Sequence, residues 1–416
     1  MSASLLLDTT EATPQCDPDQ GARKSVAPEK TFAEFFAGIG LMRMGLERMG
    51  WQIRYANDID EQKFEMYRGH FPDADRHFSC KDIHSVLACE VPEVTLATAS
   101  FPCNDLSLAG ARAGLSGKES SAFFGFISVL CGLRELRRLP QLVLLENVAG
   151  FLTSHGGKDF EKALLALNEL GYAVDAFFLD AARFVPQSRL RLFVLGVLDV
   201  AGSDGAVQPT EDALRPGALV KFVALHPHIR WRLRRLPEPP PAGAVRLETI
   251  IEPLSDDAKE WWEKKRADYL FNQMSPRHQE IVRYMMTLPT WSYGTVFRRM
   301  RNGSSMAEIR TDGIAGCLRT PRGGSGRQIL VKAGFGKFAA RLVTPREAAR
   351  LMGADEFRIA VPLNQALFGF GDAVCVPVVE WIARHYLNPV LDELPQFIPS
   401  REAAQRGKCP RRPLGR

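Results

Sequence analysis

The chain has 416 residues, 45% of them hydrophobic and 24% charged, which excludes a largely disordered protein and leaves room for two domains. Its formal net charge is +5, but residues 201–340 hold 22 Lys and Arg against 14 Asp and Glu, a net charge of +8, which leaves −3 for the remainder. A basic segment on a mildly acidic body favours contact between one part of the molecule and a polyanion, although a solvated surface gives the same excess.

Export, membrane insertion and zinc binding are not expected from the sequence. Residues 1–15 contain no basic leader, so we expect no signal peptide. We find no apolar run of the length that crosses a bilayer. The eight cysteines include no C-x-x-C pair and no histidine pattern typical of zinc, so we expect no metal.

Buried strands and helices are predicted to alternate in the first half of the chain. Residues 1–29 are polar, contain several prolines and lack periodicity, which predicts a disordered arm. From Thr31, apolar runs typical of buried strands alternate with helical patterns. We predict strands at 31–37, 52–57, 94–100, 141–146, 173–180 and 191–198, and helices at 60–70, 121–138 and 159–170. This alternation predicts an α/β domain around a mostly parallel sheet.

The pattern weakens after residue 200. A proline-rich stretch, PEPPPAG, cannot continue the interior of a sheet and indicates a module boundary. Residues 246–340 mix aromatic residues, arginines and glycines without a helical or strand period. A threonine cap, a proline at the first helical position and an acidic first turn then predict a helix that begins near Pro345. A last helix is predicted at 376–385.

Glycines and acids follow the first strands. Phe36-Ala37-Gly38-Ile39-Gly40 comes directly after the first strand, where a small ligand can approach the backbone closely, although a tight turn explains the glycines equally well. Asp58 ends the second strand, where an acid can accept hydrogen bonds from both hydroxyls of a ribose. Asp82 could accept from an adenine amino group. Each acid alone is more often a cap or a surface charge, but together with the glycines they predict a nucleoside pocket.

A cysteine, an acid and two arginines come at the ends of later strands. Pro102-Cys103 follows a strand end in a polar loop, where a nucleophile would be held, although an arbitrary cysteine is more often an inert core residue. Glu146-Asn147-Val148 ends the following strand. Gln187-x-Arg189-x-Arg191 precedes another, and arginines two positions apart on a strand can project to one side.

In order and spacing, these motifs resemble the cytosine-C5 DNA methyltransferase family, of the prokaryotic restriction-modification or defence-system type. The resemblance covers residues 31–198 and resumes at 341–388, where Arg341-Leu-x-Thr-Pro-Arg-Glu and Gly371-Asp372-Ala373-Val374 resemble the last two family motifs. It implies a Rossmann-like S-adenosylmethionine-dependent methyltransferase domain with a smaller, irregular target-recognition domain. The implied parts are a disordered arm (1–29), a catalytic and cofactor-binding domain (30–200), a target-recognition domain (201–340), C-terminal motifs that return to the catalytic domain (341–390) and a basic tail (391–416).

The resemblance implies a DNA (cytosine-5-)-methyltransferase that acts within a specific short sequence. The enzyme would flip a target cytosine out of the duplex, add Cys103 to carbon 6 and transfer a methyl group from S-adenosyl-L-methionine to carbon 5, leaving S-adenosyl-L-homocysteine. Glu146 would bind N3 and the exocyclic amine, and Asn147 would help to position that loop. Arg189 and Arg191 would stabilise charge at O2 and orient the Cys103 loop.

The resemblance also implies contacts to the cofactor and to DNA. Those to the cofactor are Phe36, Gly38, Ile39, Gly40, Asp58, Ile59, Asp82, Pro102, Asp372 and Ala373. Those to DNA are Arg298, Arg299, Arg301, Arg319, Arg322 and Arg327, which could bind phosphates or read guanines. For any one of these arginines, a solvated surface charge is the alternative.

The chain departs from the family pattern at four places, which bear on cofactor affinity and loop detail. Leu41 stands where the family often has a glycine, Asp58 where it has glutamate, Asn104 where it has glutamine, and Asp372-Ala373 where it has Asn-Ser.

Two alternatives stay open. An RNA cytosine-C5 methyltransferase is one, but that branch usually carries Pro-Cys-Gln-Pro-Phe-Thr, unlike Pro102-Cys-Asn-Asp-Leu-Ser107. A non-catalytic DNA-binding regulator is the other, and the intact Cys103 and Glu146 argue against it. We expect a monomer in the prokaryotic cytoplasm, associated with the nucleoid through double-stranded DNA and with no membrane. A cognate restriction endonuclease or defence proteins encoded nearby are the expected partners.

Overall fold

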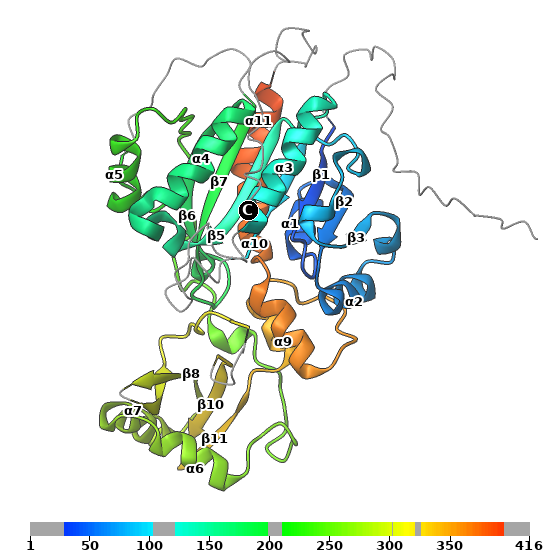
Figure 1. The fold of residues 1–416 in the computed structure, drawn as a ribbon. Coiled ribbons are helices and arrows are strands. Elements are labelled where there is room, and N and C mark those ends of the chain that lie inside the picture. Colours follow the sequence, from blue (N-terminus) through cyan, green and yellow to red (C-terminus); the bar gives the residue numbers. More distant parts are fainter. Residues whose placement is uncertain (1–28, 103–120, 199–209, 302, 321–325, 395–416) are drawn as a thin grey trace, which may run out of the picture.

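The computed structural model describes residues 29–102, 121–198, 210–301, 303–320 and 326–394. These residues form two units, one around a seven-stranded sheet and one around a four-stranded sheet (Figure 1). Both termini of the described chain belong to the larger unit, since β1 and α11 lie there while the smaller unit is inserted between them (Figure 1).

The larger sheet has the strand order β3-β2-β1-β4-β5-β7-β6. Its first five strands are parallel, and β7 is antiparallel to both β5 and β6. The strands are β1 (Thr31–Phe35), β2 (Gln52–Asp58), β3 (Phe78–Cys80), β4 (Leu96–Ala99), β5 (Leu142–Val148), β6 (Tyr172–Asp180) and β7 (Leu190–Leu198). The six predicted strands and the mostly parallel sheet are confirmed. The chain order reverses between β1 and β4, which is where open α/β sheets bind ligands.

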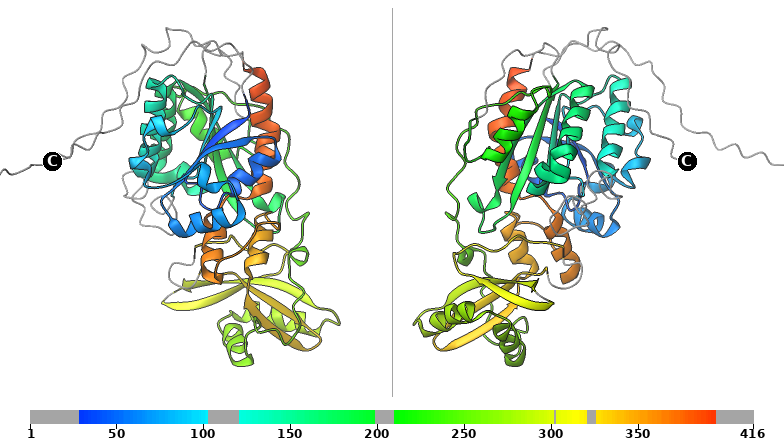
Figure 2. Two further views of the ribbon diagram at one scale, coloured as in Figure 1. Left: turned by 90° about the vertical axis from the view of Figure 1, so that its right-hand side faces the viewer. Right: turned by 60° about the vertical axis from the view of Figure 1, so that its left-hand side comes forward.

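Helices cover both faces of this sheet (Figure 2). Successive residues of β1 point to opposite faces, so that Phe32 belongs to one apolar core and Phe35 to the other. The core around Phe35 is closed by α3 (Ser121–Glu135) and α4 (Lys158–Leu170). The other is closed by α1 (Leu41–Arg48), α10 (Val376–Ile382) and α11 (Asn388–Glu393), and α2 (Glu61–His70) packs beside β2.

The C-terminal helices form one apolar run. A π-helical turn, Ala383–Leu387, joins α10 to α11, so this helix extends beyond the predicted 376–385. No apolar run of the length that crosses a bilayer is expected from the sequence, but within the part of the chain that the structure describes, Leu363–Glu393 has the length and mean hydropathy of a membrane span. Its most apolar window is 67% buried inside the molecule, as in a core helix of a globular protein. Trp51 Nε1 also donates to Asn388 Oδ1 at 2.9 Å, which ties the run to the first helix-strand unit.

The smaller unit contains an antiparallel sheet of order β11-β10-β8-β9. Its elements are α6 (Lys264–Asn272), α7 (Pro276–Thr287), β8 (Ser292–Arg301), β9 (Ser304–Arg310), β10 (Ile329–Gly334) and β11 (Lys337–Leu342). Leu270 and Val282 of the helices pack with Val296 and Val331 of the sheet. This unit is more regular than its sequence predicts. Strand β10 is buried at every position, and β8 and β9 place arginines among partly buried residues, so that neither pattern gives a clear alternation.

Short helices follow the last strand of each sheet. α5 (Gly217–Leu225) lies over α4 of the larger unit, and α8 (Pro345–Leu351) and α9 (Leu363–Asp372) follow β11 (Figure 1). The predicted helix start at Pro345 is confirmed. Thr344 Oγ1 accepts from the Glu347 backbone at 3.1 Å, and the Glu347 carboxylate accepts from the Thr344 backbone at 2.9 Å, which forms a capping box.

Candidate active site

The loop between β1 and α1 is a tight turn with three residues in the left-handed region. Phe36, Gly38 and Gly40 have φ angles of 58°, 56° and 84°. A Cβ added at Gly40 would lie 2.5 Å from the Phe71 ring, so the loop has no room for a side chain there. Such a conformation at the non-glycine Phe36 is sparsely populated and is typical of functional sites.

Asp58 holds this loop from the end of β2. Its buried carboxylate accepts from the backbone N–H of Gly38 at 2.8 Å and from that of Asp60 at 2.9 Å. A carboxylate oxygen can accept more than one hydrogen bond, so Asp58 can also accept from ligand hydroxyls. Ile59, next to it, is 65% exposed and offers an apolar surface. Asp82 caps a short helical turn by accepting from the His84 backbone at 2.9 Å.

The end of β4 is fixed where the chain enters the Cys103 loop. Phe101 is buried and packs against the rings of Phe123 and Phe151, with centroids 5.2 and 5.6 Å away. Asn147 Nδ2 donates to the Phe101 carbonyl at 3.3 Å. Pro102 is exposed, and Cys103 and Asn104 lie outside the described residues. Asn147 therefore anchors the backbone two positions before Cys103.

Glu146 and Arg191 form an ion pair at the carboxyl edge of β5. Arg191 Nε lies 3.0 Å from Glu146 Oε1, and the Glu146 side chain is largely buried. The two strands are antiparallel neighbours, with Val148 opposite Arg191, so the pair is set by the sheet register. A paired and desolvated carboxylate keeps one orientation, which suits recognition of a planar ligand edge.

Arg189 is buried and contacts backbone carbonyls. Its guanidinium donates to the carbonyls of Leu318 at 3.0 Å, Gly371 at 3.2 Å and Ala373 at 2.7 Å. Arg189 thus ties the start of β7 to the segment after β9 and to the end of α9. Arg191, rather than Arg189, lies beside Glu146.

Both arginines also contact Cys317, which the sequence did not indicate. Cys317 Sγ lies 3.4 Å from Arg189 Nη1 and 3.9 Å from Arg191 Nη2. Burial alone would raise the pKa of the Cys317 thiol, but Arg189, Arg191 and Arg319 hold that pKa below its usual value. Cys317 is 126 residues from Arg191 in the chain, so no local motif could reveal this contact.

The family profile described as C-5 cytosine-specific DNA methylase matches residues 30–388. The chain belongs to this family. It is a DNA cytosine-C5 methyltransferase that uses S-adenosylmethionine, as the sequence resemblance predicts.

Curated relatives share modest identity over most of the methyltransferase. Type II methyltransferase M.NlaX of Neisseria lactamica is 27% identical over 84% of this chain and 94% of its own length. M.HhaI of Haemophilus parahaemolyticus is 26% identical over 85% of this chain and 92% of its own. M.BanI of Aneurinibacillus aneurinilyticus is 34% identical, but over only 40% of this chain and 38% of its own length.

Solved structures share the fold of the methyltransferase. That of S. pombe Dnmt2 methyltransferase has a TM-score of 0.55 and 19% identity, and covers 86% of this chain and 98% of its own. A putative DNA modification methyltransferase encoded within an E. coli prophage has a TM-score of 0.51 and 19% identity, and covers 86% of this chain and 99% of its own. At this identity the likeness shows the S-adenosylmethionine-dependent methyltransferase fold alone.

Gln187 joins the two units of the methyltransferase. Its buried amide accepts from the Leu318 backbone N–H at 2.9 Å and donates to the Leu351 carbonyl at 2.7 Å. Pro186 and Ser188 flank it and pair with the Ala315 backbone at 2.8 and 2.9 Å. The sequence motif contained Gln187 but gave it no role.

Asp372 is brought to the glycine loop by α9. Its Oδ2 lies 2.9 Å from Lys63 Nζ of α2, and its Oδ1 accepts from Thr320 Oγ1 at 3.1 Å. The side chain of Lys63 faces Gly38, because a Cβ added at Gly38 would lie 4.0 Å from Lys63 Cδ. Lys63 therefore lies between Asp372 and Gly38, and it is a neighbour that sequence reasoning missed.

The predicted DNA-contacting arginines differ in their surroundings. Arg298 is partly buried, 5.9 Å from the Trp262 ring centroid, and Arg327 Nη2 donates to Asn364 Oδ1 at 2.7 Å. Arg299 and Arg319 are exposed. The side chain of Arg301 and all of Arg322 lie outside the described residues.

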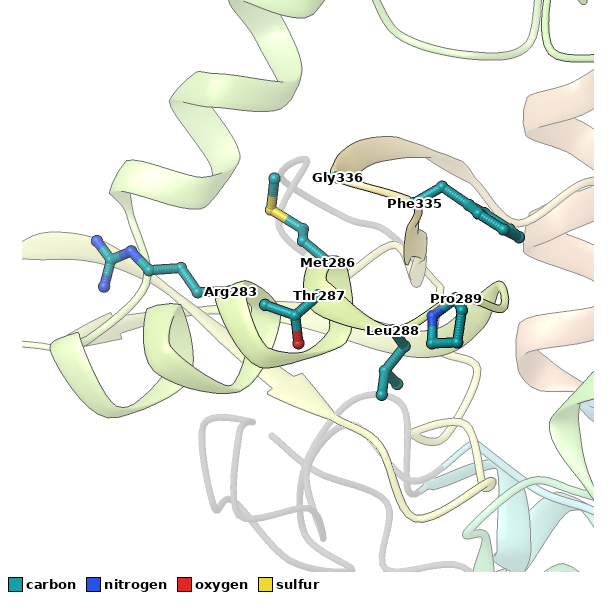
Figure 3. Close-up of a pocket in the computed structure, with 7 residues that line it drawn as sticks. All are labelled: Arg283, Met286, Thr287, Leu288, Pro289, Phe335 and Gly336. Atoms are coloured by element: carbon teal, nitrogen blue, oxygen red, sulfur yellow. The ribbon is translucent and has the colours of Figure 1, made fainter.

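A hollow of about 450 Å³ lies on the smaller unit, away from these groups (Figure 3). It is formed by the end of α7 and the β10–β11 turn, and is lined by Arg283, Met286, Thr287, Leu288, Pro289, Phe335 and Gly336. None of the predicted catalytic, cofactor or DNA-binding residues lines it. In the part of the chain that the structure describes, no group of three His, Cys, Asp or Glu side chains could hold a metal ion.

Proposed function

We propose that this methyltransferase methylates one cytosine within a specific short sequence of double-stranded DNA, with Cys103 as nucleophile and Glu146 and Arg191 as the groups that bind the flipped base. The observation that carries the proposal is the ion pair between Arg191 and the largely buried Glu146, 3.0 Å apart. It stands at the sheet edge next to Asn147, which anchors the entry to the Cys103 loop. The Cys103 loop follows β4, Glu146 lies on β5 and Arg191 lies on β7, and these three strands are consecutive neighbours in the sheet.

The chemistry follows from the reactivity of cytosine. Carbon 5 is too electron-poor to take a methyl group directly, and addition of the Cys103 thiolate to carbon 6 places the electron pair of the ring double bond on carbon 5. Glu146 donates or shares a proton at N3 as negative charge develops there, and Arg191 supplies charge at O2. S-adenosylmethionine supplies the methyl group when bound. Loss of the carbon 5 proton then restores the double bond and expels the thiolate.

Arg189, Gln187 and Asn147 position these groups. The Arg189 guanidinium is occupied by three backbone carbonyls, which fits a residue that fixes the position of Arg191 rather than one that contacts the base. Arg189 and Gln187 both reach the segment around Leu318. The predicted role of Arg189 at O2 is therefore proposed for Arg191 alone.

The residues around the glycine loop fit the cofactor. The backbone at Gly38 is open to a ligand, Asp58 can accept from the ribose hydroxyls, and exposed Ile59 can pack against the adenine. Ile39 is buried and anchors the loop to the apolar core. The proposed cofactor set is Phe36, Gly38, Ile39, Gly40, Asp58, Ile59, Asp82, Pro102, Asp372 and Ala373. The product is S-adenosyl-L-homocysteine, and no metal takes part.

We further propose that residues 201–340 recognise the target sequence through the smaller unit around the four-stranded sheet, while 30–200 and 341–390 form the catalytic domain, on which α5 also packs. The exposed Arg299 and Arg319 suit contacts to phosphates or bases. The enzyme acts as a monomer on DNA in the prokaryotic cytoplasm, without a membrane. The type II relatives support a place in a restriction-modification or phage-defence system, with a cognate endonuclease or defence proteins encoded nearby.

Bisulfite sequencing tests the proposal. DNA is taken from a methylation-free bacterial host that expresses either the wild type or Cys103→Ser. Methylation of one short sequence by the wild type, and its loss in Cys103→Ser, is the expected result. Equal methylation by both proteins would show that Cys103 is not the nucleophile. No methylation by the wild type, despite cofactor binding, would overturn the sequence-specific DNA target.

A further inference from the structure

An ion pair closes one side of the glycine loop. Lys63 Nζ and Asp372 Oδ2 are 2.9 Å apart, opposite Gly38. We propose that this pair binds the amino-acid end of the cofactor, with Lys63 donating to the α-carboxylate and Asp372 accepting from the α-ammonium. The inference rests on the proposed cofactor site and assigns Lys63 to it.

The packing of α9 brings the two charges to this place. A Cβ added at Gly369 would lie 2.7 Å from Met66 Sδ and 2.8 Å from Ile39 Cγ2, so α9 approaches both α2 and the loop as closely as glycine allows. Gln365 Nε2 also donates to the Gln62 carbonyl at 2.9 Å. Asp372, at the end of α9, is therefore held against the first turn of α2, which carries Lys63.

The position of Asp372 is electrostatically unfavourable without a partner. The C-terminal end of a helix carries partial negative charge, which disfavours an acid there. The Lys63 side chain is only 22% exposed, and burial alone would lower the pKa of its ammonium. Asp372 and Asp58 outweigh this effect and raise the pKa of Lys63 above its usual value. The Lys63 ammonium and the Asp372 carboxylate therefore lie side by side near neutral pH, one positive and one negative.

A free amino-acid end carries the complementary charges, an ammonium and a carboxylate on one carbon. Hydrogen bonds between ionised groups are stronger than those between neutral ones. Lysine has three N–H donors, so contact with Asp372 leaves others for a ligand. Asp58 lies at the same glycine, since its carboxylate accepts from the Gly38 backbone N–H at 2.8 Å. A ligand whose ribose lies at Asp58 and which crosses Gly38 ends at Lys63 and Asp372.

Ligand truncation separates this role from a structural one. S-Adenosylhomocysteine has the amino-acid end, whereas 5′-methylthioadenosine keeps the adenine, the ribose and the sulfur but lacks that end. Calorimetric titration of Lys63→Met should show binding of S-adenosylhomocysteine weakened about tenfold or more. Its affinity for methylthioadenosine should equal that of the wild type, which also shows that the variant folds. Lys63→Arg keeps the charge and should retain most of the affinity for S-adenosylhomocysteine.

A double variant tests whether Lys63 merely neutralises Asp372. Lys63→Met with Asp372→Asn removes both charges, so it should still bind S-adenosylhomocysteine weakly if Lys63 contacts the carboxylate. Wild-type affinity in the double variant, or equal losses for both ligands in Lys63→Met, would overturn the inference. Failure of the wild type to bind S-adenosylhomocysteine is a different outcome, because it would contradict the proposed cofactor site as a whole.

Discussion

One edge of the seven-stranded sheet and strand β8 of the four-stranded sheet hold their arginines in different ways. At the edge of the seven-stranded sheet, Arg189 is buried against three carbonyls and Arg191 is paired with a buried acid. On the four-stranded sheet, Arg299 is 56% exposed and lies 3.8 Å from Glu308. The contacts of Arg189 and Arg191 fix the geometry of the groups that carry out the reaction. The exposure of Arg299 leaves its side chain able to contact DNA. Substitutions should therefore affect chemistry and stability at the first sheet, and salt-dependent binding at the second.

The largest expected effect is on the chemical step. Glu146→Gln keeps the size of the side chain but removes its charge and its proton-transfer capacity, so kcat should fall about 10²- to 10⁴-fold. Single-turnover methylation at saturating DNA and cofactor measures this rate. DNA affinity should change little, because the recognition surface is untouched. A loss of affinity without a loss of rate would show that Glu146 holds the base but takes no part in the chemical step.

Arg189 should matter for stability as well as for rate. Arg189→Met leaves the carbonyls of Leu318, Gly371 and Ala373 without this donor. An unsatisfied buried acceptor costs about 1 to 3 kcal/mol, so the free energy of unfolding should fall by about 3 kcal/mol. Urea unfolding measures the change. The matched control is Arg299→Met, an exposed arginine whose removal should shift the unfolding free energy by less than about 1 kcal/mol. Equal losses of unfolding free energy in the two variants would show that Arg189 and Arg299 do not differ in their contribution to stability.

The same contrast explains what the sequence could predict. Most strands of the larger sheet are largely apolar, and its functional residues lie in the last positions of strands or just after them. Glu146 and Asn147 are therefore recognisable as polar residues that end an apolar segment. β3 was missed because a strand of three residues, Phe78–Cys80, leaves no pattern. The smaller sheet was missed because β8 places three arginines in a strand with one buried face.

Contacts between distant segments could not be predicted. Cys317 contacts Arg189 and Arg191. This contact depends on the backbone pairing of Pro186 and Ser188 with Ala315, where the two units adjoin. Lys63 meets Asp372 only because α9 packs on α2. Neither residue belongs to a local motif, and their roles depend on how the second unit returns to the first.

The contact of Cys317 with Arg189 and Arg191 predicts that the free energy of unfolding depends on pH. The arginines hold the pKa of the folded thiol below its usual value, so ionisation of Cys317 stabilises the folded state. This contribution is complete above the pKa of the unfolded thiol and is lost as the pH falls through the folded pKa. The wild type should therefore gain stability over Cys317→Ser between pH 7 and pH 9. Urea unfolding of both proteins at each pH gives the difference, and a pH-independent difference would show that the thiol stays neutral.

The smallest effect is expected at the exposed arginines of the second sheet. Arg299→Ala should weaken DNA binding only a fewfold, because one phosphate contact contributes little at physiological salt, but it should lower the slope of log K against log salt by about one. Fluorescence anisotropy over a series of salt concentrations measures this slope. Arg68→Ala is the matched control, since Arg68 is 62% exposed on α2 of the larger unit and pairs with Asp75. An unchanged slope in Arg299→Ala would remove this arginine from the phosphate contacts. A change in the preferred base at one position of the target would instead assign it to direct readout in the major groove.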